Sequence, residues 1–238
     1  MKLSYYEFFY FFFMIILTVY IWLGARNIYN KEYNYFKIRN LHYDQIDTGD
    51  IILLSYSAPA SVFNQGIICM KFIHAALFSK EGSNLYIIEF GNYFNEKVGF
   101  LKIPFSEWIK YNKSALMMYN KLEIENDSRK KRNELSLKIN NFRDNNMTNK
   151  DFSFFDYLGR YLVPGTEYKD FDTNKTDYAC YELVLNILKE VDIIESLNAT
   201  ESYVTDDMIG MKKFNLNRKY NYDEYFIADV SSLKFISD

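Results

Sequence analysis

The chain has 238 residues, enough for one membrane segment and a single domain of about 200 residues with a closed core. Its formal net charge at pH 7 is -3, and its Lys and Arg residues are scattered rather than gathered into a stripe, which argues against nucleic-acid binding. Only two cysteines occur, Cys69 and Cys180, which argues against a disulfide framework and fits a reducing compartment.

The first feature along the chain is an uncharged apolar segment. The residues FFYFFFMIILTVYIWLGA separate Glu7 from Arg26 and are about the minimum length for crossing a bilayer as a helix. A cleavable signal peptide is the alternative, but Lys2 is offset by Glu7 and no small-residue cleavage site follows. We expect residues 1–26 to be a retained transmembrane anchor.

Positive residues are more frequent after this segment than before it. Arg26, Lys31, Lys37 and Arg39 follow it, against Lys2 and the amino terminus before it. Because positively charged flanks stay in the cytosol, we expect the long C-terminal part to be cytoplasmic and attached to the membrane by a single pass. Five Asn-x-Ser/Thr triplets do not establish secretion, since an Asn-rich chain produces them by chance.

Short apolar strands follow a polar, aromatic connector at residues 27–46. The stretch DQIDTGDIILLSYS passes from polar to continuously apolar, a pattern typical of a buried strand entered from a turn. The next segments are predicted, in order, as a helix (ASVFNQGIICMKF), two strands joined by a turn (AALFSK and LYIIEF), a strand (VGFLKIP), a short helix begun near Pro104 and a strand (SALMMYNKL).

An amphipathic helix is predicted between Asp127 and Arg143. This stretch is charged on one face and apolar at Leu135, Ile139 and Phe142. The basic run Arg129–Arg132 is expected to belong to a solvated helix face, with contact to anionic lipid as the alternative.

Three residues that lie far apart along the chain point to thiol chemistry. Cys180 lies in YACYELVLNILKEVDII, which reads as a cysteine on the first turn of an apolar-faced helix. A helix N-terminus favours a reactive thiolate. His74 opens one apolar strand and Glu89 closes the next, so an imidazole and a carboxylate are available to activate the sulfur. His42 lies in the connector, and Cys69 lies in an apolar run where a buried hydrophobic role is expected.

Each candidate also has an interpretation without chemistry. Cys180 alone would be a buried helix cysteine, His74 a core histidine, and Glu89 the solvated end of a strand. The combination of all three favours a nucleophile with its activating groups. Asp50 is expected to hold the turn before the first strand and Glu182 to pair near the helix start, neither as a catalytic residue.

Four motifs together resemble a known family. They are TGDIIL (48–53), IHAALFSKEGSNLYIIEF (73–90), VGFLKIPFSEWI (98–109) and YACYELVLNILKEVDI (178–193). They are similar to the circularly permuted NlpC-type, papain-like enzymes, closest to YiiX-like proteins, which include poxviral relatives, and more distantly to lecithin-retinol acyltransferase-like enzymes. The resemblance covers residues 47–194. It implies an α+β fold for residues 47–238, with an antiparallel sheet packed on helices and a C-terminal extension.

The resemblance also implies an activity. In that family the histidine comes first, its polar partner lies on the next strand and the cysteine opens a late helix, as do His74, Glu89 and Cys180. Tyr181 stands where members commonly have Ser. The implied function is a cysteine hydrolase or acyltransferase that acts through an acyl-thioester on peptide, isopeptide or lipid acyl substrates.

A different class of function stays open from the sequence. A membrane-anchored interaction or lipid-binding protein without turnover, for example a viral membrane component, would keep the same fold. No cofactor or metal is expected, since the sequence has no metal-ligand cluster, glycine-rich phosphate loop or dinucleotide fingerprint.

Overall fold

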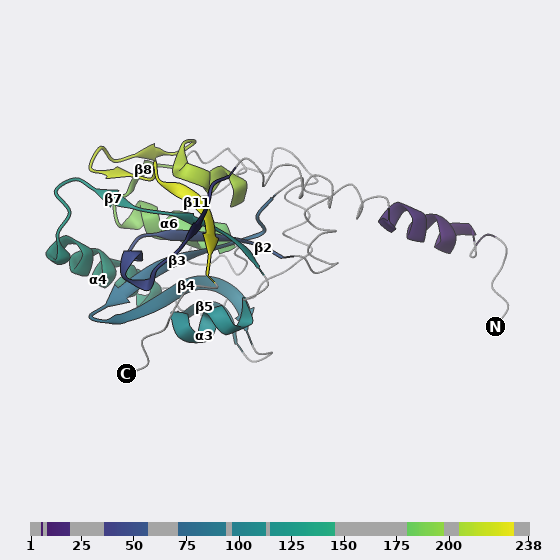
Figure 1. The fold of residues 1–238 in the computed structure, drawn as a ribbon, viewed down its shortest axis with the longest axis horizontal. Helices are drawn as coiled ribbons and strands as arrows, with labels where there is room; N and C mark the ends of the chain where they lie inside the picture. The colour runs from purple at the N-terminus through teal and green to yellow at the C-terminus, as the bar shows by residue number, and fades with distance from the viewer. Residues whose placement is uncertain are drawn as a thin grey trace.

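A mixed seven-stranded sheet organises the chain. The computed structural model in Figure 1 describes residues 6, 9–19, 36–56, 71–93, 97–112, 115–145, 180–197 and 205–230. Within these residues the strand order is β1-β11-β6-β2-β3-β4-β5, and every neighbouring pair is antiparallel except β1 and β11. The strands are β1 (Ile38–Asn40), β2 (Ile51–Ser55), β3 (His74–Glu81), β4 (Asn84–Tyr93), β5 (Lys97–Pro104), β6 (Leu116–Asn120) and β11 (Tyr225–Asp229).

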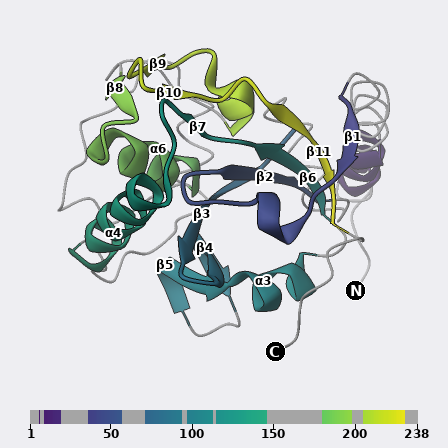
Figure 2. The same cartoon turned by 60° about the vertical axis from the view of Figure 1, so that its left-hand side comes forward.

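Helices cover both faces of this sheet (Figure 2). On one face, α6 (Cys180–Glu190) packs against β3 and β4, and α4 (Arg129–Asn145) packs against β3 and α6. On the other face, α3 (Phe105–Tyr111) packs against β4 and β5. We call these the α6 face and the α3 face, and each has its own cluster of buried apolar side chains. The expected α+β class, a large sheet packed with helices, is confirmed at this level.

The remaining described elements are short. They are the 3-10 helices η2 (Tyr43–Gln45) and η3 (Thr205–Met211), and two ribbons formed by β7 (Glu123–Ile124) with β10 (Tyr220–Asn221) and by β8 (Ile194–Ser196) with β9 (Asn215–Leu216). Three of them, η3, β9 and β10, follow Glu195, outside the part of the sequence that carries the family resemblance.

β2 lies at the centre of the sheet and is buried on both faces, as its unbroken apolar sequence predicts. Ile51 and Leu53 belong to the α6-face cluster, while Ile52 and Leu54 belong to the α3-face cluster. The alternation follows from the strand geometry, in which successive side chains point to opposite faces. The continuous apolar run of β2 therefore contributes side chains to both hydrophobic clusters.

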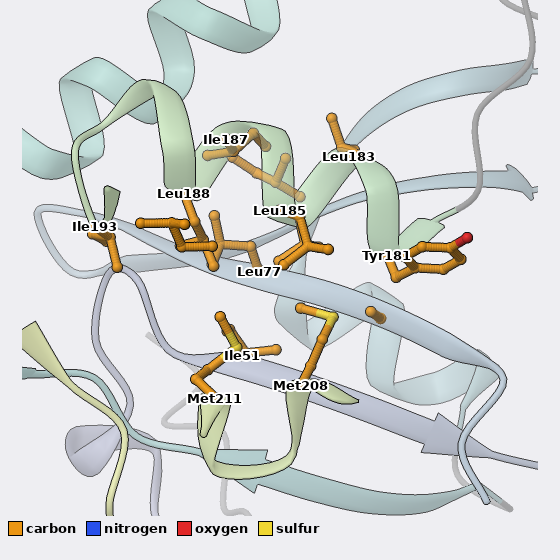
Figure 3. Close-up of a cluster of buried hydrophobic side chains, with 14 of the residues drawn as sticks. Ile51, Leu77, Tyr181, Leu183, Leu185, Ile187, Leu188, Ile193, Met208 and Met211 are labelled. Carbon is orange, nitrogen blue, oxygen red and sulfur yellow. The ribbon is translucent and has the colours of Figure 1, made fainter. Parts of the chain in front are cut away.

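The α6 helix is apolar enough to be buried along most of its length. Figure 3 shows Leu185 and Leu188 of α6 over Leu77 of β3, with Met208 of η3 near Ile51 of β2. All these side chains are buried in one cluster. Helix α6 and the later η3 segment thus share the same core.

The predicted amphipathic helix is α4, with one correction. Leu135, Ile139 and Phe142 are buried, which confirms the apolar stripe. Arg132, expected on a solvated face, is instead buried, and its guanidinium donates to the carbonyl oxygens of Thr48 and Leu122 (both 2.7 Å) and pairs with Asp127. A planar guanidinium with five donors satisfies several buried acceptors at once, so this basic residue is part of the core boundary.

The turn before β2 requires a glycine. Gly49 has a φ of 92°, in the region that favours glycine, and a Cβ there would collide with the side chain of Leu122. Its carbonyl oxygen accepts a hydrogen bond from the Tyr222 hydroxyl (2.7 Å). The TGD motif is therefore a tight turn against which the C-terminal part of the chain packs.

Asp50 holds this turn, as the sequence predicts. Its buried carboxylate accepts hydrogen bonds from the backbone N–H groups of Asp47 (2.8 Å) and Leu122 (2.9 Å) and from the Tyr119 hydroxyl. Without the carboxylate the two backbone N–H groups would lose this partner, while the Tyr119 hydroxyl would keep a longer contact with the carbonyl oxygen of Gln45 (3.3 Å). A buried unpaired donor costs about 1 to 3 kcal/mol. The side chain is structural.

Only part of the segment expected to span a membrane is described. Residues 9–19 are helical, and their large apolar side chains are exposed. Among the described residues, no helix reaches the length and apolarity needed to cross a bilayer. Phe8 and residues 20–25 lie outside the described range. The helix expected over residues 60–72 lies outside it as far as residue 70, Cys69 included, and its last two residues, Lys71 and Phe72, are described and are not helical.

The expected connector contributes a strand to the sheet. β1 falls within residues 27–46 and pairs in parallel with β11, for example Ile38 with Ile227. The C-terminal extension therefore supplies β11, which lies between β1 and β6.

Asp50 makes the stability of the fold depend on pH. Burial raises the pKa of Asp50 to about 7, although its hydrogen bonds oppose this. Between the unfolded pKa of the carboxyl and the folded value of about 7, the folded chain binds a proton that the unfolded chain has released. The free energy of unfolding should therefore fall as pH rises through this window, by up to about 1.4 kcal/mol per pH unit.

We expect Asp50→Asn to remove this contribution, because an amide does not titrate. Urea unfolding at a series of pH values would measure the slope for both chains. Asp44→Asn, at an exposed position in η2, is the matched control and should leave the slope unchanged. An Asp50→Asn slope equal to that of the wild type would mean that Asp50 does not contribute.

Candidate active site

The pairing of β3 with β4 brings His74 and Glu89 to the same face of the sheet. Ala76 of β3 lies directly opposite Glu89 of β4, so their side chains share a face. His74 is two residues from Ala76 on the same strand and points the same way. The Nε2–H of His74 donates a hydrogen bond to Oε2 of Glu89 at 2.7 Å. This face is the α3 face, where Ala76 is buried.

Glu89 is a buried carboxylate with an additional donor. Its exposed fraction is 0%, and its Oε2 also accepts a hydrogen bond from Nε1–H of Trp108 on α3 at 2.9 Å. Within the described part of the chain, the other oxygen, Oε1, is buried and has no hydrogen-bond partner. Oε2 is therefore the carboxylate oxygen that contacts the imidazole of His74.

Cys180 approaches His74 from the start of α6. Its Sγ lies 3.7 Å from the carbonyl oxygen of Ile73, the residue before His74, and its charge acts on the imidazole of His74. Because Glu89 occupies Nε2, Nδ1 is the ring nitrogen left for the thiol. His74 begins β3 at the end of the sheet, so its ring stands between a helix packed on the α6 face and a carboxylate on the α3 face.

The electrostatics of this group favour a charged imidazole. Burial alone would lower the pKa of His74, but the charges of Cys180 and Glu89 beside it, together with hydrogen bonds to both, raise it well above its ordinary value. The imidazolium therefore contributes stability that is fully present below the unfolded pKa of about 6.5 and is lost as pH rises through the folded pKa. Its side chain is 17% exposed, so the ring still meets solvent.

The structure brings together the three residues singled out in the sequence. Cys180, His74 and Glu89 form one cluster, while Asp50 holds a turn and His42 is exposed at the start of η2. Glu182, expected to pair near the helix start, is buried in the first turn of α6. The catalytic roles of Cys180, His74 and Glu89 stay predictions.

Sequence reasoning missed Trp108 as part of this cluster. It lies in the motif VGFLKIPFSEWI, but no spacing rule connects a tryptophan on a short helix with a carboxylate 19 residues earlier. Its rarity was the one available signal, because the chain has two Trp residues against 22 Tyr and 21 Phe. The contact arises because α3 packs directly against β4.

No group of His, Cys, Asp and Glu side chains suited to a metal ion occurs among the residues that the structure describes. The chemistry that the described cluster itself offers is that of a nucleophilic sulfur, a proton acceptor and an orienting carboxylate.

Comparisons with known proteins return a structural likeness and no family. No protein family model matches the chain, and no curated protein matches it. The chain is similar to the solved structure of the metalloprotein YiiX from Escherichia coli O157:H7, with a TM-score of 0.37 and 14% sequence identity, over 78% of this chain and 99% of that chain. The permuted NlpC-type assignment stays a prediction.

An NMR titration of the two histidines tests the electrostatics of the cluster. We expect Glu89→Gln to lower the pKa of His74 by about one pH unit or more, because the amide removes the opposing charge beside the imidazolium. Trp108→Phe should lower it less, because it keeps an aromatic ring in the core and removes one N–H that holds the carboxylate in place. His42→Ala assigns the second histidine signal. A His74 pKa unchanged in both variants would contradict this arrangement.

Proposed function

We propose that this chain is a cysteine hydrolase or acyltransferase, with Cys180 as nucleophile, His74 as proton acceptor and Glu89 as the group that orients the imidazole. One observation carries the proposal: the imidazole of His74 stands between the thiol of Cys180 and a fully buried carboxylate. The order of these residues along the chain agrees with the resemblance to permuted NlpC-type, papain-like enzymes.

The reaction begins from the Cys180 thiolate beside a His74 imidazolium, a pair that either is already present or forms when Nδ1 of His74 takes the thiol proton. The sulfur attacks a carbonyl carbon, and the backbone N–H of Cys180 at the start of α6 donates to the oxyanion. His74 then returns the proton to the leaving amine or alcohol as its bond to the carbonyl carbon breaks. The resulting acyl-thioester is cleaved by water in a hydrolase or by a second nucleophile in a transferase.

The substrate class is an amide or a lipid acyl ester close to a membrane. The helical residues 9–19 expose Phe, Ile, Leu and Met side chains, which lose contact with water if they enter a lipid phase. We propose that residues 1–26 attach the chain to a membrane and that the remaining chain lies on the cytoplasmic side.

A catalytically silent interaction or lipid-binding protein is the second candidate. A specific contact favours it: Cys180 Sγ is placed as a donor to the Ile73 carbonyl oxygen, a bond that requires the neutral thiol. Cys180 is also largely buried, with 9% of the residue exposed. In that case the thiol would be a packed side chain and would react slowly.

A thiol-directed alkylating probe separates the two candidates without knowledge of the substrate. For the enzyme we expect rapid labelling near neutral pH that Cys180→Ala abolishes and that His74→Ala slows by about a hundredfold, the order of magnitude of a lost general base. Mass spectrometry of the labelled peptide would measure the rate at this residue.

Two variants serve as controls for this experiment. His42→Ala removes the other histidine, at an exposed position, and should leave the rate unchanged. Cys69→Ser removes the only other thiol and should leave the label on Cys180. Slow labelling that is indifferent to His74→Ala would exclude the enzyme and favour the silent protein.

Membrane attachment has its own test. We expect the full chain to sediment with phospholipid vesicles after carbonate washing, and a chain without residues 1–26 to stay in the supernatant with its thiol reactivity intact. The double variant Ile15→Lys and Ile16→Lys keeps the chain length and changes only exposed side chains, and it should reduce sedimentation, because a charge in a bilayer costs about 2.5 to 3.5 kcal/mol. Sedimentation of the shortened chain would show that these residues are not the anchor.

A further inference from the structure

A carboxylate from the C-terminal part of the chain binds the backbone just before His74. In η3, Asp206 accepts hydrogen bonds from two consecutive N–H groups, that of Lys71 at Oδ2 (2.7 Å) and that of Phe72 at Oδ1 (2.8 Å). Burial raises the pKa of Asp206, and these two bonds oppose this by stabilising the charged form. The two carboxylate oxygens of Asp206 therefore each accept a hydrogen bond from one of two adjacent backbone amides, and we call this contact the clamp.

The clamped backbone leads directly into the candidate site. Phe72 is fully buried, the N–H of Ile73 donates to the carbonyl oxygen of Leu54 on β2 (2.9 Å), and the Ile73 carbonyl oxygen meets Sγ of Cys180. The next residue is His74. Residues 71–73 are thus fixed by η3 on one side and by β2 on the other, and the thiol contacts the same peptide.

The η3 segment is itself firmly placed. Met208 and Met211 are buried in the α6-face cluster, and the N–H of Gly210 donates to the side-chain oxygen of Asn120 at the end of β6 (2.8 Å). The carboxylate of Asp206 is therefore anchored to the same core on which α6 rests.

We propose that Asp206 is a positioning residue of the active site, which holds residues 71–73 so that the imidazole of His74 faces the thiol of Cys180. The inference rests on the proposed function for its catalytic meaning, and it extends the site to a region outside the family resemblance. Asp206 acts through the backbone and touches no reacting atom. A displacement of about 1 Å at a catalytic pair costs up to about a hundredfold in rate, so the clamp has a measurable effect.

The test compares Asp206→Asn and Asp206→Ala in the full chain. Asparagine keeps one acceptor oxygen and places an NH2 group opposite the second amide, while alanine removes both acceptors. Asp207→Asn is the matched control, because Asp207 is the adjacent carboxylate in η3 and pairs with Lys213 instead of the clamped backbone. Three quantities are measured: the melting temperature, the pKa of His74 by NMR, and the rate of Cys180 alkylation across the pH range between ordinary histidine and cysteine pKa values.

We expect the alkylation rate at neutral pH to fall by about tenfold to a hundredfold in Asp206→Ala and by less in Asp206→Asn. The pKa of His74 should fall in the same order, because the imidazole moves away from the charges that raise it. Asp207→Asn should match the wild type in both. If alanine prevents folding, the asparagine variant carries the comparison.

Two outcomes overturn the inference. One is a folded Asp206 variant with the wild-type His74 pKa and alkylation profile, and the other is an equal effect of Asp207→Asn. The failure of the proposed function looks different, since wild-type alkylation would then be indifferent to His74→Ala. In that case the His74 pKa alone decides the clamp: a decrease in the Asp206 variants supports it, and an unchanged value refutes it.

Discussion

The register between β3 and β4 is the constraint on which the candidate site depends. Ala76 opposite Glu89 places the carboxylate and His74 on one face, and a slip by a single residue would turn Glu89 toward the α6 face. The register is fixed by burial on both sides, because the neighbouring residues of β3 and β4 alternate between two separate clusters. Packing on both faces of the sheet therefore fixes the register, and the register fixes the hydrogen bond between His74 and Glu89.

Three shielded carboxylates use their charge in different ways. Asp50 gives one oxygen to the N–H of Asp47 in its own turn and the other to the N–H of Leu122, and Asp206 gives both to two consecutive amides. Glu89 instead receives both of its donors, His74 and Trp108, at one oxygen. The first two carboxylates therefore hold backbone in place, while the third acts on a titrating ring. Because Glu89 is fully buried, it interacts with the imidazole through a medium that screens charge weakly.

The sequence predicts the parts of this structure that local patterns encode. Unbroken or alternating apolar runs indicate β2 to β6, and the spacing of Leu135 and Ile139 indicates α4. The contacts of Arg132, Trp108 and Asp206 have no local signature. Each contact depends on which distant element packs beside the side chain. Asp206, for example, binds the N–H groups of Lys71 and Phe72, which lie 135 and 134 positions earlier in the chain. From the sequence alone, charged residues such as Arg132 and Asp206 have no visible partners, because the tertiary fold supplies those partners.

The place of β11 has a consequence for how the protein is synthesised. β11 is the last strand that the structure describes, yet it lies inside the sheet, between β1 and β6. While the ribosome is still adding residues before Tyr225, β1 has no partner and the edge of β6 is open. Cys180 and the clamp at Asp206 also emerge long after His74 and Glu89. Translation order thus keeps Cys180 apart from His74 and Glu89 until the late part of the chain has left the ribosome.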